Sequence, residues 1–550
     1  MNALVPLPVL LPLCATGLSL AFGTRLGRFQ RFISVAVLTA VTALSAILMV
    51  AADRQGPLSV HLGDFAPPLG ITLVADRLSG LMLTVSSAVT LCVLVYSLGQ
   101  GMTDRDKETP LAVFHPAYLI LVAGVSCTFL AGDLVNLFVG FEIMLVASFV
   151  LLTLGGTGPR MRAGSTYVIV SLFSSMLFLT AIAMTYAATG TANFAQLAAR
   201  LAELPTGVRT LIQVLLLTVF AIKAAVFPLA AWLPDSYPTA PAPVTAVFAG
   251  LLTKVGVYCM LRTESLLFPG NRVGDLLMAV ALASMVIGIL GAVAQTDLKR
   301  LLSFTLISHI GYMVFGIGLA TREAYGGAIV YVAHHITVQT TLFLVAGLIE
   351  RRNGTTELTR IGGLAQAAPM LALLFFVPAM NLAGIPPLSG FIGKLGLMRA
   401  GVADGGGWAW ALVAGAAATS LLTLYVVAKV WNLAFWRAAP PGAVAAGTVL
   451  ESGDDSDDDP DAGPDRIHGT GDEGVAPAQR PAGRAVAGTS PGPAVITTNR
   501  LPHPMIAATA VTIGIGLAFT VFAGPLISYT DRTATEILQR SPYIQEVLGR

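Results

Sequence analysis

Seven ionisable side chains lie within long apolar stretches of the sequence, and they are the residues most able to do chemistry there. They comprise one carboxyl, three amines and three imidazoles: Glu142, Lys223, Lys254, Lys394, His309, His334 and His335. A charge at the centre of a bilayer costs about 2.5–3.5 kcal/mol on insertion scales, so such residues usually have a function. Carboxylates, amines and imidazoles at one depth can pass protons through ordered water. The set therefore predicts a proton relay across the middle of a membrane.

We expect a different role for each part of this relay. Glu142 and Lys223 should form a coupled pair that gates proton uptake, because each charge alone is costly and a pair neutralises both. Lys254 and a histidine at 334 or 335 should form the centre, and Lys394 the exit-side group. A protonation change at one group shifts the titration of its neighbour, so the charge state would propagate along the row.

For some of these residues, a purely structural role remains an alternative to a role in the relay. Lys394 lies close enough to a helix end that its amine could reach the membrane interface. His309 could be a hydrogen-bonded structural histidine. His334 and His335 are consecutive and point to different sides of one helix, so we expect only one of them to face the path.

The low content of charged residues indicates that the bilayer, rather than water, surrounds most of the chain. The 550-residue chain is 55% hydrophobic and 11% charged, whereas a soluble chain is about a quarter charged. A net charge of +2 gives no reason to expect nucleic acid as a partner. The four cysteines lie in apolar runs without close spacing and predict neither disulfides nor a metal site. No nucleotide or redox-cofactor motif is present, so we expect no cofactor.

The hydropathy pattern predicts an all-α polytopic membrane protein with about fourteen spans, each of roughly 20 apolar residues. The expected spans are 3–23, 31–52, 73–99, 111–131, 134–155, 164–189, 208–233, 240–262, 273–294, 299–320, 325–350, 368–399, 408–436 and 503–529. An even number places both termini on one side, and the distribution of basic residues between alternate loops predicts that this side is outside.

The chain divides into five segments along its length. We expect N-terminal helices in 1–110, a first repeat in 111–262 and a second repeat in 273–436. Residues 437–502 are rich in Asp, Pro and Gly and predict a disordered cytoplasmic loop. Residues 503–550 predict a last helix and an interfacial tail.

Prolines interrupt two of the expected spans, each of which also carries a lysine. We expect helix breaks at Pro228 and Pro234 in the first, and at Pro378, Pro386 and Pro387 in the second. Two interrupted helices at corresponding places in two halves predict an inverted-repeat transporter. The alternative is that the helices are kinked and have no transport role.

Three segments carry a resemblance to a known family: FAIKAAVFPLAAWLPDSYPTAPAPVTAVFAGLLTKVGVYCMLR, SFTLISHIGYM and GIPPLSGFIGK. From about residue 70 to 436 the chain resembles the antiporter-like family shared by Mrp cation/proton antiporters and the membrane arm of respiratory complex I. The resemblance implies about fourteen helices, with helices four to eight and nine to thirteen as inverted five-helix repeats. It also implies a charged, hydrated axis made of Glu142, Lys223, Lys254, one of His334 and His335, and Lys394.

Further segments resemble the D-subunit branch of the Mrp antiporters. They are LGDFAPPLGITLVADRLSGLM, KVWNLAFW and SPYIQEVLG, together with Lys394 after GFIG. One position departs from the family pattern, since Gln339 stands where many relatives have lysine.

The resemblance implies a proton-translocating subunit of a Na+/H+ antiporter, with K+ or Li+ as further possible ions. It implies a bacterial cell membrane, surrounding lipid, and a hetero-oligomeric complex with Mrp subunits A, B, C, E, F and G. Such a chain is a transporter subunit and not an enzyme. Two alternatives remain: a proton-pumping subunit of an NADH:quinone oxidoreductase, and a passive scaffold or channel whose charges only fill a hydrated interior.

Overall fold

The computed structural model describes residues 1–22, 29–100, 111–438 and 501–549. Of the loop expected at 437–502, residues 439–500 lie outside the described residues. The chain is almost entirely helical, because a backbone in lipid must satisfy its hydrogen bonds internally. Thirteen helices in the described ranges are long and apolar enough to cross a bilayer. The prediction of an all-α polytopic membrane protein is confirmed.

The elements of the first half include one small hairpin. They are α1 (Leu7–Phe22), α2 (Phe29–Gln55), β1 (Leu58–His61), β2 (Thr72–Ala75), α3 (Arg77–Gln100), α4 (Leu111–Leu130), α5 (Leu134–Thr153), α6 (Gly158–Thr189), α7 (Phe194–Glu203), α8 (Thr206–Ala224), α9 (Leu233–Ser236), α10 (Ala242–Val247), the π-helical turn η5 (Phe248–Leu252) and α11 (Thr253–Leu266). Strands β1 and β2 pair antiparallel, with Leu58 opposite Ala75.

The second half is helical throughout its described part. Its elements are α12 (Gly274–Ala294), α13 (Leu298–Leu319), α14 (Arg322–Asn353), α15 (Leu364–Ala367), α16 (Pro369–Ala383), α17 (Ser389–Asp404), α18 (Gly407–Val430), the π-helical turn η7 (Trp431–Trp436), α19 (His503–Val521), α20 (Ala523–Gln539) and α21 (Ser541–Leu548). Short 3-10 turns flank some of the elements of both halves, namely Asn2–Leu4, Leu62–Asp64, Tyr237–Thr239 and Leu358–Arg360.

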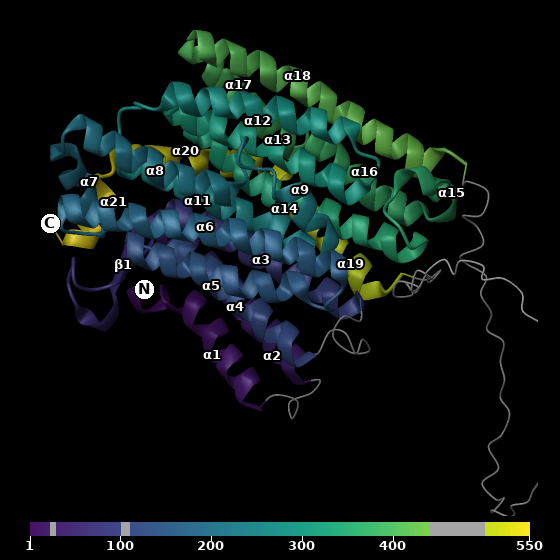
Figure 1. Cartoon of the computed structure of the whole chain (residues 1–550), viewed down its shortest axis with the longest axis horizontal. Helices are drawn as coiled ribbons and strands as arrows, with labels where there is room; N and C mark the ends of the chain where they lie inside the picture. Colours follow the sequence, from purple (N-terminus) through teal and green to yellow (C-terminus); the bar gives the residue numbers. More distant parts are fainter. Residues whose placement is uncertain (23–28, 101–110, 439–500, 550) are drawn as a thin grey trace, which may run out of the picture.

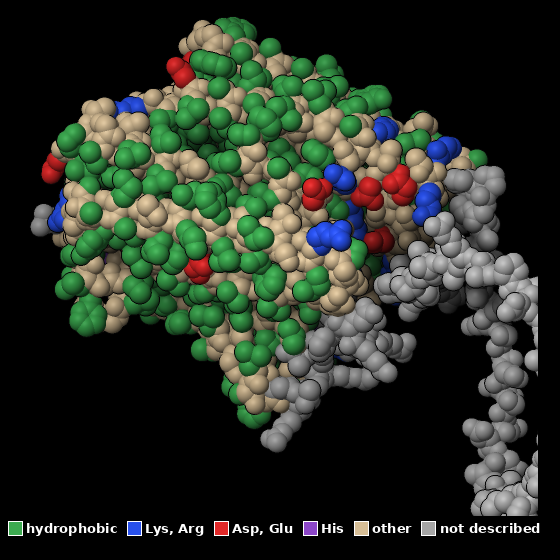
Figure 2. Space-filling view, viewed as in Figure 1, with side chains coloured by type: hydrophobic (Ala, Val, Ile, Leu, Met, Phe, Trp, Pro, Cys, Tyr) green, Lys and Arg blue, Asp and Glu red, His purple; other side chains and the backbone are tan. Residues whose placement is uncertain are grey.

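The long helices lie side by side along the longest axis of the molecule (Figure 1). Both termini lie at one end of this bundle, which we call the terminal end and which also holds β1, α7 and α21 (Figure 1). The other end, called the opposite end, carries α15 and the C-terminal end of α18. Figure 2 shows hydrophobic side chains over most of one face, with charged side chains gathered toward the opposite end. This pattern fits a bundle whose middle is surrounded by lipid.

Polar caps set where several helices begin. Asp133 Oδ1 accepts from the backbone N–H of Asn136 at 2.7 Å at the start of α5. Asp297 caps α13 and Thr321 caps α14 in the same way. Each cap satisfies a backbone N–H that the helix leaves free, which contributes about 1 kcal/mol.

Two helices are interrupted where the sequence predicts it. Helix α8 ends at Ala224, and Pro228 lies in the irregular segment before α9. Helix α16 ends at Ala383, and Pro386 and Pro387 lie in the segment before α17. Each helix is followed by a residue with positive φ, Ala225 at 56° and Gly384 at 84°.

Two of the five expected breaks differ from the structure. Pro378 lies inside α16, which runs on to Ala383, so the prediction of a break there is wrong. A membrane helix tolerates one missing backbone hydrogen bond when its neighbours pack around it. Pro234 lies in the first turn of α9, beside the break, where a proline costs no helical hydrogen bond.

Helix α14 is the centre of the bundle. Its spanning window is entirely buried, and it contacts α3, α10, α13, α16, α17, α19 and α20. The C-terminal segment after α19 also packs against the bundle. Helix α20 packs against α14 and α11, and α21 packs against α7 and β1. Helix α14 can therefore place side chains against both halves of the chain.

Helices α12 and α13 approach each other closely through glycine. A Cβ added at Gly288 would lie 2.4 Å from the backbone nitrogen of Ser308, whereas one added at Gly514 in α19 would have nothing within 4 Å. Small residues let membrane helices pack closely. We expect Gly288→Val to destabilise the protein by about 1–3 kcal/mol through overpacking. Thermal unfolding in detergent measures this, with Gly514→Val as the control. Equal melting temperatures for the two variants would contradict this account of α12–α13 packing.

Candidate functional site

The π-helical turn η5 interrupts the span that carries Lys254. This side chain is fully buried, and its Nζ donates a hydrogen bond to the carbonyl oxygen of Ala249, within the turn, at 2.5 Å. Single π-turns within α-helices are frequently found at functional sites. The turn therefore supplies a backbone acceptor to an amine that has no carboxylate within ion-pair distance among the described residues.

Helices α13 and α14 bring aromatic and imidazole rings together beside Lys254. The ring centroids of His309 and His335 lie 5.2 Å apart, and both histidines are fully buried. The Tyr331 hydroxyl lies 2.6 Å from His309 Nδ1, and the Tyr331 ring also contacts both His334 and His335. Lys254 and His309 both lie close enough to His335 to interact with it electrostatically. The three imidazoles thus form one cluster.

The two consecutive histidines face different neighbours, as their spacing on a helix requires. His335 lies against His309, whereas His334 Nδ1 lies 3.0 Å from the Ser389 hydroxyl at the start of α17. Because α17 begins just after the break that follows α16, His334 connects the cluster to the second interrupted helix.

Lys394 is held at that same break. Its Nζ donates to the carbonyl oxygens of Leu382 and Ala383, each at 3.1 Å, and lies 3.1 Å from Ser420 Oγ. These carbonyls lie at the C-terminal end of α16, where helix dipoles favour a cation. The amine also lies 5.1 Å from the centroid of the Tyr312 ring. Lys394 therefore points into the protein and not toward the membrane interface.

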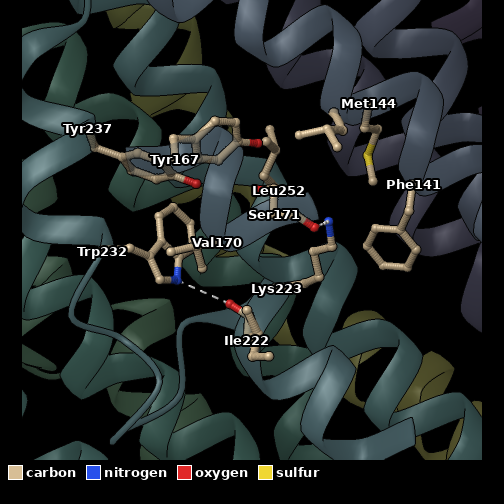
Figure 3. Close-up of a pocket in the computed structure, with 11 residues that line it drawn as sticks. Phe141, Met144, Tyr167, Val170, Ser171, Ile222, Lys223, Trp232, Tyr237 and Leu252 are labelled. Carbon is tan, nitrogen blue, oxygen red and sulfur yellow. Dashed lines mark hydrogen bonds between the residues drawn. The ribbon is translucent and has the colours of Figure 1, made fainter. Parts of the chain in front are cut away.

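Lys223 lines a cavity at the first interrupted helix (Figure 3). The cavity has a volume of about 30 Å³, which is room for about two water molecules. Lys223 Nζ lies 3.5 Å from the Ser171 carbonyl oxygen and 5.6 Å from the centroid of the Phe141 ring. Trp232 Nε1 donates to the Ile222 carbonyl oxygen at 3.3 Å, which satisfies a carbonyl near the end of α8 (Figure 3).

Glu142 and Lys223 do not form a direct ion pair, although both are among the described residues. The Glu142 carboxylate instead accepts a short hydrogen bond from the Ser175 hydroxyl of α6. The two charges still interact electrostatically. Helix packing thus leaves the expected pair close enough to be coupled, but Glu142 is partnered by a hydroxyl.

The matching sequence family covers the interrupted helices and the histidine cluster. The family described as "NADH:quinone oxidoreductase/Mrp antiporter, TM" matches residues 131–423. The chain is 43% identical over 440 residues to the D subunit of the Na(+)/H(+) antiporter of Alkalihalophilus pseudofirmus, covering 79% of this chain and 87% of the relative. It is 36% identical over 439 residues to the protein of the same name from Bacillus subtilis, with the same coverage.

The chain belongs to this family, in its Mrp D-subunit branch. A chain in the structure of the Mrp complex from a Dietzia species has a TM-score of 0.84 at 30% identity, and the match covers 100% of both chains. A chain of respiratory complex I from Thermus thermophilus has a TM-score of 0.73 at 23% identity, which shows a shared fold. The prediction of the family and of its D-subunit branch is confirmed.

Several residues of the site carry no signal that sets them apart in the sequence. Tyr331, Ser389 and Ser420 are hydroxyl residues among many in these helices, and the π-turn ahead of Lys254 contains only common apolar residues and a glycine. Gln339 donates from its amide Nε2 to the Leu302 carbonyl oxygen at 2.8 Å. This position therefore connects α14 to α13 and carries no charge.

The contact between Tyr331 and His309 yields a test of the cluster. Tyr331→Phe removes the only hydroxyl that lies within 3 Å of His309 Nδ1 among the described residues. We expect a loss of about 1 kcal/mol in stability and a changed tautomer ratio of His309. Nitrogen NMR of labelled histidine and thermal unfolding measure the two effects. Tyr425→Phe, at an exposed position of α18, is the control, and an unchanged His309 signal in Tyr331→Phe would contradict the contact.

Proposed function

We propose that the chain carries protons through the membrane along a row of side chains from Glu142 through Lys223, Lys254 and the histidine cluster to Lys394. One observation carries the proposal: each of the three buried amines is bound at an interrupted or π-helical segment, and the three imidazoles cluster with Tyr331 between two of these segments. Each amine is bound to backbone carbonyl oxygen and none to a carboxylate within ion-pair distance among the described residues. An amine held in this way can lose its proton without leaving a buried carboxylate unpaired.

The two interrupted helices support a division into two halves that alternate in protonation. Lys223 lies one residue before the end of α8, and Lys394 binds the carbonyls that end α16. Interrupted helices of inverted repeats place ion sites at mid-membrane depth. In the proposed division, α4 to α11 form one repeat and α12 to α18 the other, and α14 joins them through its histidines.

The identity of the ion that is exchanged for the proton is inferred from the names of the relatives. Proteins named as D subunits of Na+/H+ antiporters are 36–43% identical to this chain. We propose that the chain is the corresponding subunit of a Na+/H+ antiporter complex in a bacterial cell membrane, and that the terminal end faces outward. The distribution of basic loops supports this orientation, because basic residues concentrate in cytoplasmic loops.

The decisive experiment measures exchange in everted vesicles from an antiporter-deficient host that expresses the complete operon. Glu142→Gln, Lys223→Ala and Lys254→Ala should each lower the Na+-dependent collapse of the pH gradient by at least about tenfold, since a positioned acid or base contributes roughly 10²-fold or more. Lys429→Ala is the matched control, because its amine binds the Val293 and Gln295 carbonyls away from the row.

Co-purification of the partner subunits separates loss of transport from loss of assembly. Full exchange in the Lys254→Ala complex would overturn the proposed path. If added Na+ has no effect in the parent vesicles and NADH-driven pumping depends on the chain, the chain serves an oxidoreductase. If Glu142→Gln leaves exchange intact, Glu142 is not needed to take up protons.

A further inference from the structure

A second cluster of charged side chains lies at the terminal end, outside the row described above. Arg77, at the start of α3, donates to Asp53 Oδ1 at 2.8 Å and makes a close ion pair with Glu536 of α20. Arg262, near the end of α11, binds Asp76 through two hydrogen bonds of 2.6 and 2.8 Å. Four separate parts of the chain thus meet in one network, and most of its charged side chains have a partner of opposite charge.

A small cavity within this network is lined by polar atoms. It is bounded in part by Asp76, Arg262, Ser265, Glu536, Arg540 and Tyr543. Among the described residues, three buried atoms on this lining have no hydrogen-bond partner: Glu536 Oε1, Arg540 Nε and the Tyr543 hydroxyl. The volume of about 10 Å³ is close to that needed for one water molecule. A water here would find a carboxylate acceptor, a hydroxyl and a guanidinium donor.

Helix α11 connects this cavity to the central lysine. Lys254, Tyr258 and Arg262 are each four residues apart and so lie on one face of the helix, about 6 Å from one to the next along its axis. The Arg262 guanidinium lies 3.2 Å from the Tyr258 hydroxyl through Nη2. A polar stripe therefore runs from the middle of the bundle to the terminal end.

We propose that Glu536 is a proton-binding carboxyl at the terminal end, joined to the central relay by the Lys254–Tyr258–Arg262 stripe. A water molecule in the cavity relays the proton: it gains one O–H bond to a proton arriving from the solution as one of its own O–H bonds breaks and that proton passes to Glu536 Oε1. The reverse transfer returns the proton to the solution, and Arg77 stays bound to Oε2 in both states. The proposal rests on the proposed function, since it adds the site at which protons meet the solution on this side.

The surroundings suit a group that titrates near neutral pH. Burial and the charge of Asp76 together raise the pKa of Glu536 to about 7, against the opposing charges of Arg77 and Arg262. The other charged and titratable groups around this network come from α2, α20 and α21: Asp53, Tyr529, Arg532, Arg540 and Tyr543. Below pH 7 the carboxyl is mainly protonated, and above it mainly ionised.

Glu536→Gln tests the proposal in the complete complex reconstituted into liposomes. A cleavable tag after α21 reports which side the terminal end faces. With the pH varied only on that side, the parent should show a transition in exchange rate near pH 7. The variant should lose this transition and exchange at least about tenfold more slowly. The amide still reaches Arg77, and Arg77 keeps Asp53, so the fold is retained.

Glu546→Gln is the matched control, because Glu546 of α21 accepts from Ser59 and does not line the cavity. Its pH profile should match that of the parent. A Glu536→Gln complex with the parent's pH profile, alongside a Lys254→Ala complex without exchange, would overturn this inference and leave the proposed function standing.

Infrared difference spectra give a readout that does not depend on transport. The C=O stretch of protonated carboxyls should appear as the pH is lowered through about 7, and one component of it should be missing in Glu536→Gln but present in Glu546→Gln. Glu264 is a second buried carboxyl in this part of the protein, so the comparison is made on the difference between the parent and variant spectra. If no component is lost in Glu536→Gln, the proton resides elsewhere and the inference fails even if exchange is slow. If the band behaves as expected while Lys254→Ala exchanges normally, the proton site stands and the proposed path fails.

Discussion

The hydrogen bonds between buried amines and backbone carbonyls are the interactions on which the site depends. In lipid, a carbonyl that leaves its helical partner must find another donor. Lys394 satisfies two such carbonyls at the end of α16, and Lys254 binds one within a π-helical turn. Interruption of the helix and burial of the amine are therefore one arrangement. Each would be costly alone, and together they hold an ionisable group inside the bundle with no carboxylate in ion-pair distance among the described residues.

Helix α14 links the histidine cluster to the second interrupted helix. It is buried along its spanning length, so its histidines meet α13 on one side and the start of α17 on another. Tyr331 adds a hydroxyl that contacts one imidazole and a ring that contacts the other two. The arrangement of the cluster thus follows from the packing of one helix against several others.

Apolar length made the polytopic all-α fold predictable from the sequence, and three segments with a known resemblance made the family predictable. Pro378 shows where local chemistry misleads, because tertiary packing carries the helix past it. The distance between Glu142 and Lys223 depends on how α5, α6 and α8 pack, which no local pattern encodes. The π-turn and the contacts of Tyr331 were not predictable for the same reason. The charged partners that the tail after α19 finds on α2 and α3 also depend on packing and not on local composition.

The ion pair between Arg77 and Glu536 joins residues that are 459 positions apart. A ribosome therefore releases the first three helices long before the acid that completes their charge network exists. Until α20 is made, Arg77 binds Asp53 but lacks the Glu536 carboxylate. Domains of a growing chain generally fold in order from the N-terminus, but here a helix made late completes a charge network begun by helices made early. A chain cut short before α20 would therefore keep the ion pair between Arg77 and Asp53 and lose the contact that ties α3 to α20.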